Sequence, residues 1–191
     1  LDEDVFSASR IKSLSKSDIE VILIDEADSS NNVASELAKQ GAPEGTVVVV
    51  RRQASGKGRM GRSFISNEDN GLYLSLILRP KIPASESVSI TVACAVAVLE
   101  AIEALTNIKC SIKWVNDIYI DGKKACGILT EGSVNNEKKL DYAVVGIGIN
   151  VIAPENGFPD DIKEIATAIF PGKTEENIKE KIVADVVNKF F

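Results

Sequence analysis

A basic, glycine-rich stretch is the part of the sequence best suited to bind an anion. Residues Arg51–Ser63 read RRQASGKGRMGRS and follow the strand-like run Thr46–Val50. No Asp or Glu occurs between Glu44 and Glu68, although the chain carries a formal charge of −6. Glycines let a backbone approach an anion closely, and cationic side chains neutralise it. The stretch therefore predicts a phosphate-binding loop.

The same stretch partly matches three nucleotide-binding motifs. Residues 56–61 have the GxGxxG spacing, and residues 56–63 fall one residue away from a P-loop. Both motifs need a helix directly after the glycines, whereas 64–71 is polar and Gly71–Leu78 predicts a strand. A kinase-type loop does lie between strands, but the other kinase motifs are missing. A solvated loop without a ligand therefore stays open as the alternative.

A second polar cluster, KWVND, interrupts an apolar stretch. We interpret Ile112–Ile120 as one strand. Because side chains alternate between the two faces of a strand, Lys113 and Asp117 would lie on one face and Trp114 and Asn116 on the other. Burying such groups is costly unless they face a ligand or pair with each other. The cluster therefore predicts a second part of a site.

The residue types in this cluster suit a nucleotide and its metal. Asn116 and Asp117 could hold Mg²⁺, and Lys113 could contact phosphates. Trp114 could either join the core or stack on a flat ring such as adenine. Lys124 directly precedes an apolar strand, so we expect its side chain to point inward.

A third polar group follows the strand-like run Glu20–Ile24. Residues Asp25–Asn32 read DEADSSNN and precede a helical pattern. Ser29, Ser30 and Asn31 could simply cap that helix, or they could hydrogen-bond a polar ligand. Both interpretations stay open from spacing alone.

Hydrophobic periodicity gives the elements that would position these groups. Strands are predicted at Glu20–Ile24, Thr46–Arg52, Gly71–Leu78, Ile112–Ile120, Lys123–Thr130 and Leu140–Val151. Helices are predicted at Ser7–Leu14, from about Val33 to Gly41, and at Ser87–Leu105, Asp161–Phe170 and Glu175–Phe191. Several strands are linked by hairpins, with Asp121–Gly122 as one turn. We therefore expect an α+β fold, a mixed or antiparallel sheet packed with helices.

Composition narrows the class of protein. The chain has 191 residues and 45% hydrophobic residues, which suits one domain. It has no histidine, so histidine-based triads and zinc sites are excluded. Its three cysteines match no disulfide framework. No apolar run approaches the roughly 20 residues of a membrane span. We therefore expect a soluble, cytoplasmic protein.

Together these motifs resemble those of the biotin protein ligases, also called biotin–[acetyl-CoA-carboxylase] ligases. The family signatures STN, GRGRxGR, KWPND, KxxGIL and GIGIN are matched in order at residues 29–31, 56–62, 113–117, 124–129 and 146–150. The matches span nearly the whole chain, which makes the resemblance specific.

The resemblance implies a class II synthetase-like catalytic domain and a two-step reaction. ATP and biotin, with Mg²⁺, would give biotinyl-5′-AMP and pyrophosphate. The biotin would then pass to a lysine of the biotin carboxyl carrier domain of acetyl-CoA carboxylase. The first step brings a carboxylate against a polyanion, so cations must cancel the repulsion.

The matched motifs also imply which residues would do this. Catalysis would rest on Lys124, Arg59 and Arg62. Biotin would contact Ser29, Ser30, Asn31, Gln53, Gly56, Lys57, Gly58, Arg59, Lys124 and Gly127. ATP would contact Arg62, Lys113, Trp114, Asn116, Asp117 and Asn150, with Asp117 as the Mg²⁺ ligand.

The chain departs from the family pattern in several places. Lys57 replaces an Arg, which keeps the charge but loses the planar fork, while Val115 and Ser30 replace Pro and Thr. We expect residues 1–17 to be a connecting segment and 18–191 the catalytic domain. The family's SH3-like C-terminal domain and the helix-turn-helix of its repressor-type members are not in this sequence. Nucleic-acid binding would need that helix-turn-helix, and a homodimer through a sheet edge is possible, as in some relatives.

Two alternatives stay open. One is a lipoate or octanoate ligase or transferase of related fold. The other is the effector-binding part of a biotin-responsive transcriptional repressor, which would not exclude ligase activity.

Overall fold

A seven-stranded mixed sheet forms the centre of the molecule. The computed structural model describes residues 6–61, 64 and 70–191. In the order β1-β2-β3-β7-β6-β5-β4, the first two strands are parallel and all other neighbours are antiparallel. The strands are β1 (Glu20–Ala27), β2 (Thr46–Gln53), β3 (Gly71–Leu78), β4 (Ser111–Lys113), β5 (Asp117–Ile120), β6 (Lys123–Val134) and β7 (Leu140–Asn150). The predicted α+β class is confirmed.

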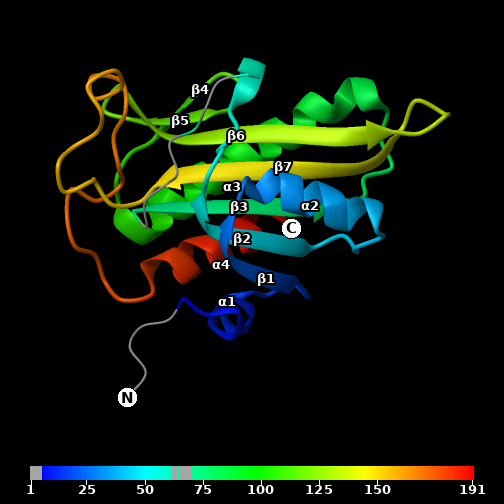
Figure 1. Ribbon diagram of the computed structural model, residues 1–191, viewed down its shortest axis with the longest axis horizontal. Coiled ribbons are helices and arrows are strands. Elements are labelled where there is room, and N and C mark those ends of the chain that lie inside the picture. Colours follow the sequence, from blue (N-terminus) through cyan, green and yellow to red (C-terminus); the bar gives the residue numbers. More distant parts are fainter. Residues whose placement is uncertain (1–5, 62–63, 65–69) are drawn as a thin grey trace.

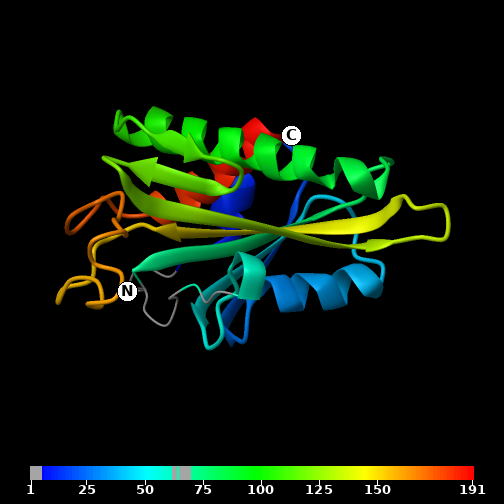
Figure 2. The same cartoon turned by 90° about the horizontal axis from the view of Figure 1, so that it is seen from above.

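Helices cover the two faces of the sheet unequally. They are α1 (Ala8–Leu14), α2 (Ser30–Lys39), α3 (Ser87–Thr106) and α4 (Ile178–Phe190), with 3₁₀ turns η1 (Arg59–Gly61) and η2 (Ala84–Glu86). The long α3 lies with α4 and α1 on one face, and α2 lies on the other (Figures 1 and 2). The larger core lies on the α3 side, whereas α2 packs Ala34 and Ala38 against Val48 and Val50. Beside α2, part of the second face is left for a site.

Helix α3 is more apolar than the sequence analysis allowed. Residues Ala84–Thr106 are long and apolar enough, by length and composition alone, to cross a membrane. An apolar helix in the core of a folded domain passes the same test, and here Cys94, Val98 and Ile102 are fully buried in the main core. Packing on the sheet therefore accounts for the composition.

The predicted helix at Asp161–Phe170 is wrong. The segment forms turns, in which Ile162 and Lys163 both donate to the Pro159 carbonyl. It then runs beside the sheet, with bridges between Ala166 and Lys124 and between Phe170 and Ile152. Its backbone groups thus bond to segments distant in sequence, and helical spacing alone could not reveal this. The C-terminal helix also begins later than predicted, at Ile178.

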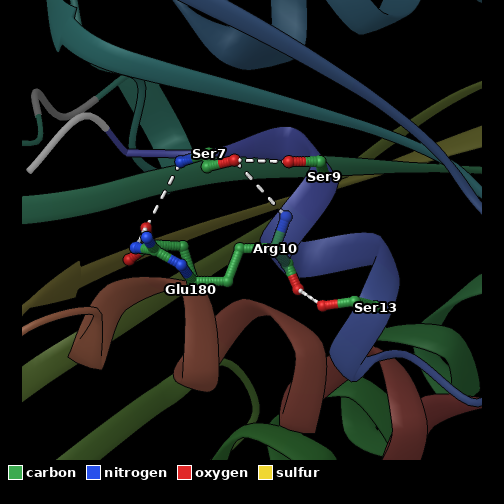
Figure 3. A network of polar contacts seen from close by, with 5 residues as sticks. All are labelled: Ser7, Ser9, Arg10, Ser13 and Glu180. Carbon is green, nitrogen blue, oxygen red and sulfur yellow. Dashed lines mark hydrogen bonds and ion pairs between the residues drawn. The ribbon is translucent and has the colours of Figure 1, made fainter. Parts of the chain in front are cut away.

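A buried carboxylate joins the N-terminal helix to the C-terminal one. Ser7 caps α1, and its backbone N–H donates to Glu180 Oε1 at 3.3 Å (Figure 3). Arg10 Nη1 lies 3.0 Å from the same oxygen, and Glu180 is only 3% exposed. A buried charge needs such partners, so this contact fixes α1 on α4.

Arg10→Ala should therefore destabilise the fold more than Glu180→Gln. The first leaves a buried carboxylate without its cation and should cost about 3 kcal/mol, whereas the neutral amide keeps an acceptor and should cost about 1 kcal/mol. Urea denaturation measures both. As a control, Glu175→Gln removes an exposed ion pair with Lys181 and should change stability by less than about 0.5 kcal/mol. The reverse order for Arg10 and Glu180 would contradict this account.

Candidate active site

A cavity lies on the second face of the sheet, beside the start of α2. It has a volume of about 450 Å³, including its open mouth. The start of α2, the end of β2, the glycine-rich loop, the β4–β5 turn, β6 and β7 all contribute to it. Its lining comprises Ser29, Ser30, Asn31, Gln53, Lys57, Gly58, Arg59, Phe64, Asn116, Lys124, Gly127, Ile128, Leu129, Gly146, Ile147 and Gly148. The structure thus brings residues from all five sequence motifs together on one lining, with Gly146, Ile147 and Gly148 coming from the GIGIN motif.

The start of α2 provides a buried polar end to this cavity. Ser29 caps the helix by accepting from the Asn31 N–H at 3.2 Å. Gln53 Oε1 accepts from the Ser30 N–H at 2.8 Å, and this ties the helix to the end of β2. Capping is therefore confirmed for Ser29, and the same residues line the cavity. The two interpretations left open by the sequence are compatible.

Asn31 packs directly on the sheet from the start of α2. Its Oδ1 accepts from the Ser75 hydroxyl at 2.7 Å, and its Nδ2 donates to Glu131 Oε2 at 2.8 Å and to the Leu129 carbonyl at 3.3 Å. A side chain at Gly146 would overlap the Asn31 amide. Glycine is required here because the amide packs directly on the strand.

The polar cluster 113–117 is not one strand, and that prediction is wrong. β4 ends at Lys113, a turn follows, and β5 begins at Asp117 and pairs back on β4. Asn116 holds the turn to β6, because its Nδ2 donates to the Ile128 carbonyl at 3.0 Å and its own carbonyl accepts from the Ile128 N–H. The predicted alternation of faces therefore does not apply.

The turn instead forms a charged group with Lys124. Lys124 Nζ lies 2.8 Å from Asp117 Oδ1, which also accepts from Asn116 Nδ2 at 3.1 Å. Lys124 points into the cavity, as predicted, and its terminal atoms lie close enough to Gly127 to leave little room for a side chain there. The Lys124 ammonium group is thus held at the cavity by the Asp117 carboxylate of the neighbouring strand β5.

Asp117 and Asn116 are suited to Mg²⁺ only together with phosphates. Within residues 6–61, 64 and 70–191, no cluster of three or more His, Cys, Asp or Glu could hold a metal ion. Mg²⁺ is commonly bound by one or two carboxylates plus substrate phosphates and water. The Asp117 carboxylate fits that pattern, and in the structure its Oδ1 contacts Lys124 Nζ and Asn116 Nδ2.

The described residues of the glycine-rich loop lie along the edge of the cavity. The Ala54 and Ser55 N–H groups donate to the Ala27 and Asp28 carbonyls, and the Phe64 N–H donates to the Gly56 carbonyl at 2.8 Å. Lys57, Gly58 and Arg59 line the cavity. Arg62, predicted for catalysis and ATP, lies outside the described residues.

Other predicted residues lie away from the lining. Trp114 is 75% exposed, and Lys113 Nζ contacts the Tyr119 hydroxyl at 3.2 Å. The Asn150 amide donates to the Thr167 carbonyl at 2.9 Å, and Gly56 is not among the lining residues. Their roles toward biotin or ATP stay predictions.

Several residues at the cavity were not singled out from the sequence. The centroid of the Phe64 ring lies 6.0 Å from Lys124 Nζ. The ring packs against Gly148, where an added Cβ atom would lie only 2.9 Å from the ring. Glycines on alternate positions of a strand can signal such close contacts. Beside the lining, Ser75 is the one serine in the apolar strand Gly71–Leu78 and was a second available signal, whereas Glu131 had none.

Comparison with known proteins agrees with this geometry. Residues 23–150 match the model of the biotin/lipoate A/B protein ligase family. The chain belongs to this family. The match covers more than half of the chain, and the resemblance to the biotin protein ligase catalytic domain is confirmed.

Relatives of this family share most of the chain. It is 42% identical over 167 residues to the "Bifunctional ligase/repressor BirA" of Bacillus spizizenii, covering 87% of this chain and 51% of that protein. It is 32% identical over 154 residues to the "Biotin--[acetyl-CoA-carboxylase] ligase" of Paracoccus denitrificans, covering 80% and 59%. The chain thus spans about half the length of these relatives.

A solved structure supports the fold and the family. The biotin protein ligase from Aquifex aeolicus in complex with biotin and ATP matches with a TM-score of 0.70 and 32% identity. The match covers 90% of this chain and 70% of that one.

Gly146→Ala should disturb the polar end of the cavity. The added methyl group would overlap the Asn31 amide, so we expect a loss of about 1–3 kcal/mol in the free energy of unfolding. Urea denaturation measures the loss. Gly172→Ala is the matched control because open space surrounds it, and it should change stability by less than about 0.5 kcal/mol. Equal stability of both variants would refute the close contact.

Proposed function

We propose that this chain is the catalytic domain of an ATP-dependent biotin ligase. It would form biotinyl-5′-AMP and pyrophosphate from biotin and ATP, and would transfer biotin to a lysine of a biotin carboxyl carrier domain of acetyl-CoA carboxylase. The observation that carries this proposal is that one cavity holds both the polar start of α2 and the Lys124 ammonium group.

The two ends of the cavity differ in chemistry, as the two ends of biotin do. Ser29, Ser30, Asn31 and Gln53 would recognise the ureido group, which both donates and accepts hydrogen bonds. Lys124 would hold the carboxylate and the α-phosphate, because a partly buried ammonium group binds anions strongly. The similar ligase from Aquifex aeolicus was solved in complex with biotin and ATP, which supports these two molecules as the ligands.

Charge neutralisation would then allow the first step. The biotin carboxylate attacks the α-phosphorus of ATP, a new O–P bond forms, and pyrophosphate leaves. Lys57 and Arg59 of the loop, together with Lys124, would offset the negative charge and keep water from the adenylate. Arg62, Lys113, Trp114 and Asn150 are proposed for ATP. Mg²⁺, held by Asp117, would neutralise phosphate charge when bound.

Some parts of the proposal concern the wider protein. We propose a cytoplasmic location, residues 18–191 as the catalytic domain, and a homodimer through a sheet edge, β1 or β4. Nucleic-acid binding would require a helix-turn-helix outside this sequence.

The decisive test is ATP–pyrophosphate exchange with biotin, lipoate and octanoate in parallel. We expect exchange with biotin at a rate at least about tenfold above that with either fatty acid, since a pocket built to hydrogen-bond a polar group rejects analogues that lack it. Exchange with lipoate but not biotin would overturn the proposal in favour of the lipoate branch of the family.

Lys124→Ala should lower adenylate formation by about 100-fold or more, because the loss of a positioned cation leaves the developing charge uncompensated. Biotin-dependent exchange measures the effect. Lys123→Ala is the matched control, since the Lys123 ammonium group contacts the Lys163 carbonyl at 3.1 Å and does not line the cavity. An equal loss in both variants would mean that Lys124 acts only on the fold.

A second role as the effector-binding part of a repressor is favoured by one observation. The relative from Bacillus spizizenii is named a bifunctional ligase/repressor. In that role the adenylate would serve as both intermediate and corepressor. If so, biotin and ATP together should strengthen DNA binding by the full-length gene product, and unchanged DNA binding would argue against it.

A further inference from the structure

We propose that Glu131 is a positioning residue that ties the glycine-rich loop to the start of α2, and thereby sets how fast a ligand enters and leaves the cavity. Glu131 lies on β6 outside the sequence motifs and outside the cavity lining. The expected effect of Glu131 on the entry and release of biotin rests on the proposed biotin function.

The two carboxylate oxygens of Glu131 serve different elements. Oε2 accepts from Asn31 Nδ2 at 2.8 Å, and Oε1 lies 3.4 Å from Lys57 Nζ. Asn31 belongs to α2 and Lys57 to the loop, and both line the cavity. Glu131 is therefore a bridge between two walls of the site, in addition to the hydrogen bond from the Ser30 N–H to Gln53 at the base of the loop.

The strand places Glu131 where this bridge is possible. Side chains alternate along β6, and the preceding Thr130 hydroxyl contacts Thr91 of α3 at 2.7 Å on the opposite face. Glu131 thus faces α2 and the loop. A carboxylate on this face is the natural acceptor for an amide and an ammonium group that approach from two sides.

The two halves of the bridge differ in strength and in purpose. Asn31 is buried, and Glu131 takes one of its amide hydrogens while the Leu129 carbonyl is the other acceptor, so Glu131 fixes which way the amide faces. The Lys57–Glu131 pair is more exposed, with side-chain exposures of 40% and 37%, and exposed pairs are weak. A weak pair suits a contact that opens whenever a ligand passes.

Trypsin cleavage after Arg59 tests the bridge without any ligand. Arg59 is exposed in the loop, so cleavage there reports how often the loop opens. We expect Glu131→Gln and Lys57→Ala each to speed this cleavage about threefold, in keeping with a weak pair. The double variant should also reach only about threefold, because both changes break the same contact. A ninefold effect in the double variant, or no effect in the single ones, would overturn the proposal.

Two controls separate the bridge from general stability. Glu137→Gln removes another exposed carboxylate–lysine pair, Glu137 with Lys139 at 3.0 Å, and should leave cleavage after Arg59 unchanged. Cleavage after the exposed Lys173, between β7 and α4, is the internal reference. An equal acceleration after Lys173 would show loss of stability rather than release of the loop, and would overturn the proposal.

Biotin exchange tests the consequence for the ligand. Labelled biotin is chased with unlabelled biotin from the wild-type chain and from Glu131→Gln, Glu131→Ala and Glu137→Gln. We expect release to be about threefold faster in Glu131→Gln, which keeps an acceptor for Asn31, and about tenfold faster in Glu131→Ala, which removes both contacts. Unchanged release in Glu131→Ala would overturn this part of the proposal. If the wild-type chain binds no biotin, the proposed function fails, and the trypsin experiment still decides whether Glu131 holds the loop.

Discussion

The packing of the Asn31 amide on Gly146 is the constraint on which the site depends. Asn31 is 3% exposed, so its amide oxygen and both amide hydrogens need partners inside the protein. Ser75, Leu129 and Glu131 supply them from β3 and β6. The Asn31 amide can pack against the backbone of β7 only because Gly146 has no side chain. One buried amide therefore sets the position of α2 relative to three strands.

Fixing α2 in this way also fixes the polar end of the cavity. The Ser30 N–H reaches Gln53 at the end of β2, and the loop starts directly after that residue. The cavity is thus built at the point where α2, β2 and the loop meet. The other face of the sheet is covered by α1, α3 and α4 and carries most of the core (Figure 2). The face that holds α2 therefore has room for the cavity.

Charge is arranged locally rather than across the molecule. The chain is acidic overall, with a formal charge of −6, yet Lys57, Arg59 and Lys124 all line one cavity. In the structure, carboxylates balance two of these cations, since Asp117 pairs with Lys124 and Glu131 with Lys57. An anionic ligand would compete with these carboxylates for the cations. The site can therefore stay folded when empty and still bind negative charge.

The sequence alone determined the features that depend on neighbours along the chain. The apolar runs of β3 and α3, the cap at Ser29 and the Asp121–Gly122 turn, with φ of 48° and 78°, are all local. The motifs indicated the family and most of the cavity lining. Tertiary structure decided the rest. Asn116 divides the 112–120 segment by bonding to Ile128, and residues 161–170 follow the sheet instead of forming a helix. Glu131 reaches the site through Asn31, 100 positions away. These outcomes depend on hydrogen bonds between distant segments, and no local pattern of residues encodes them.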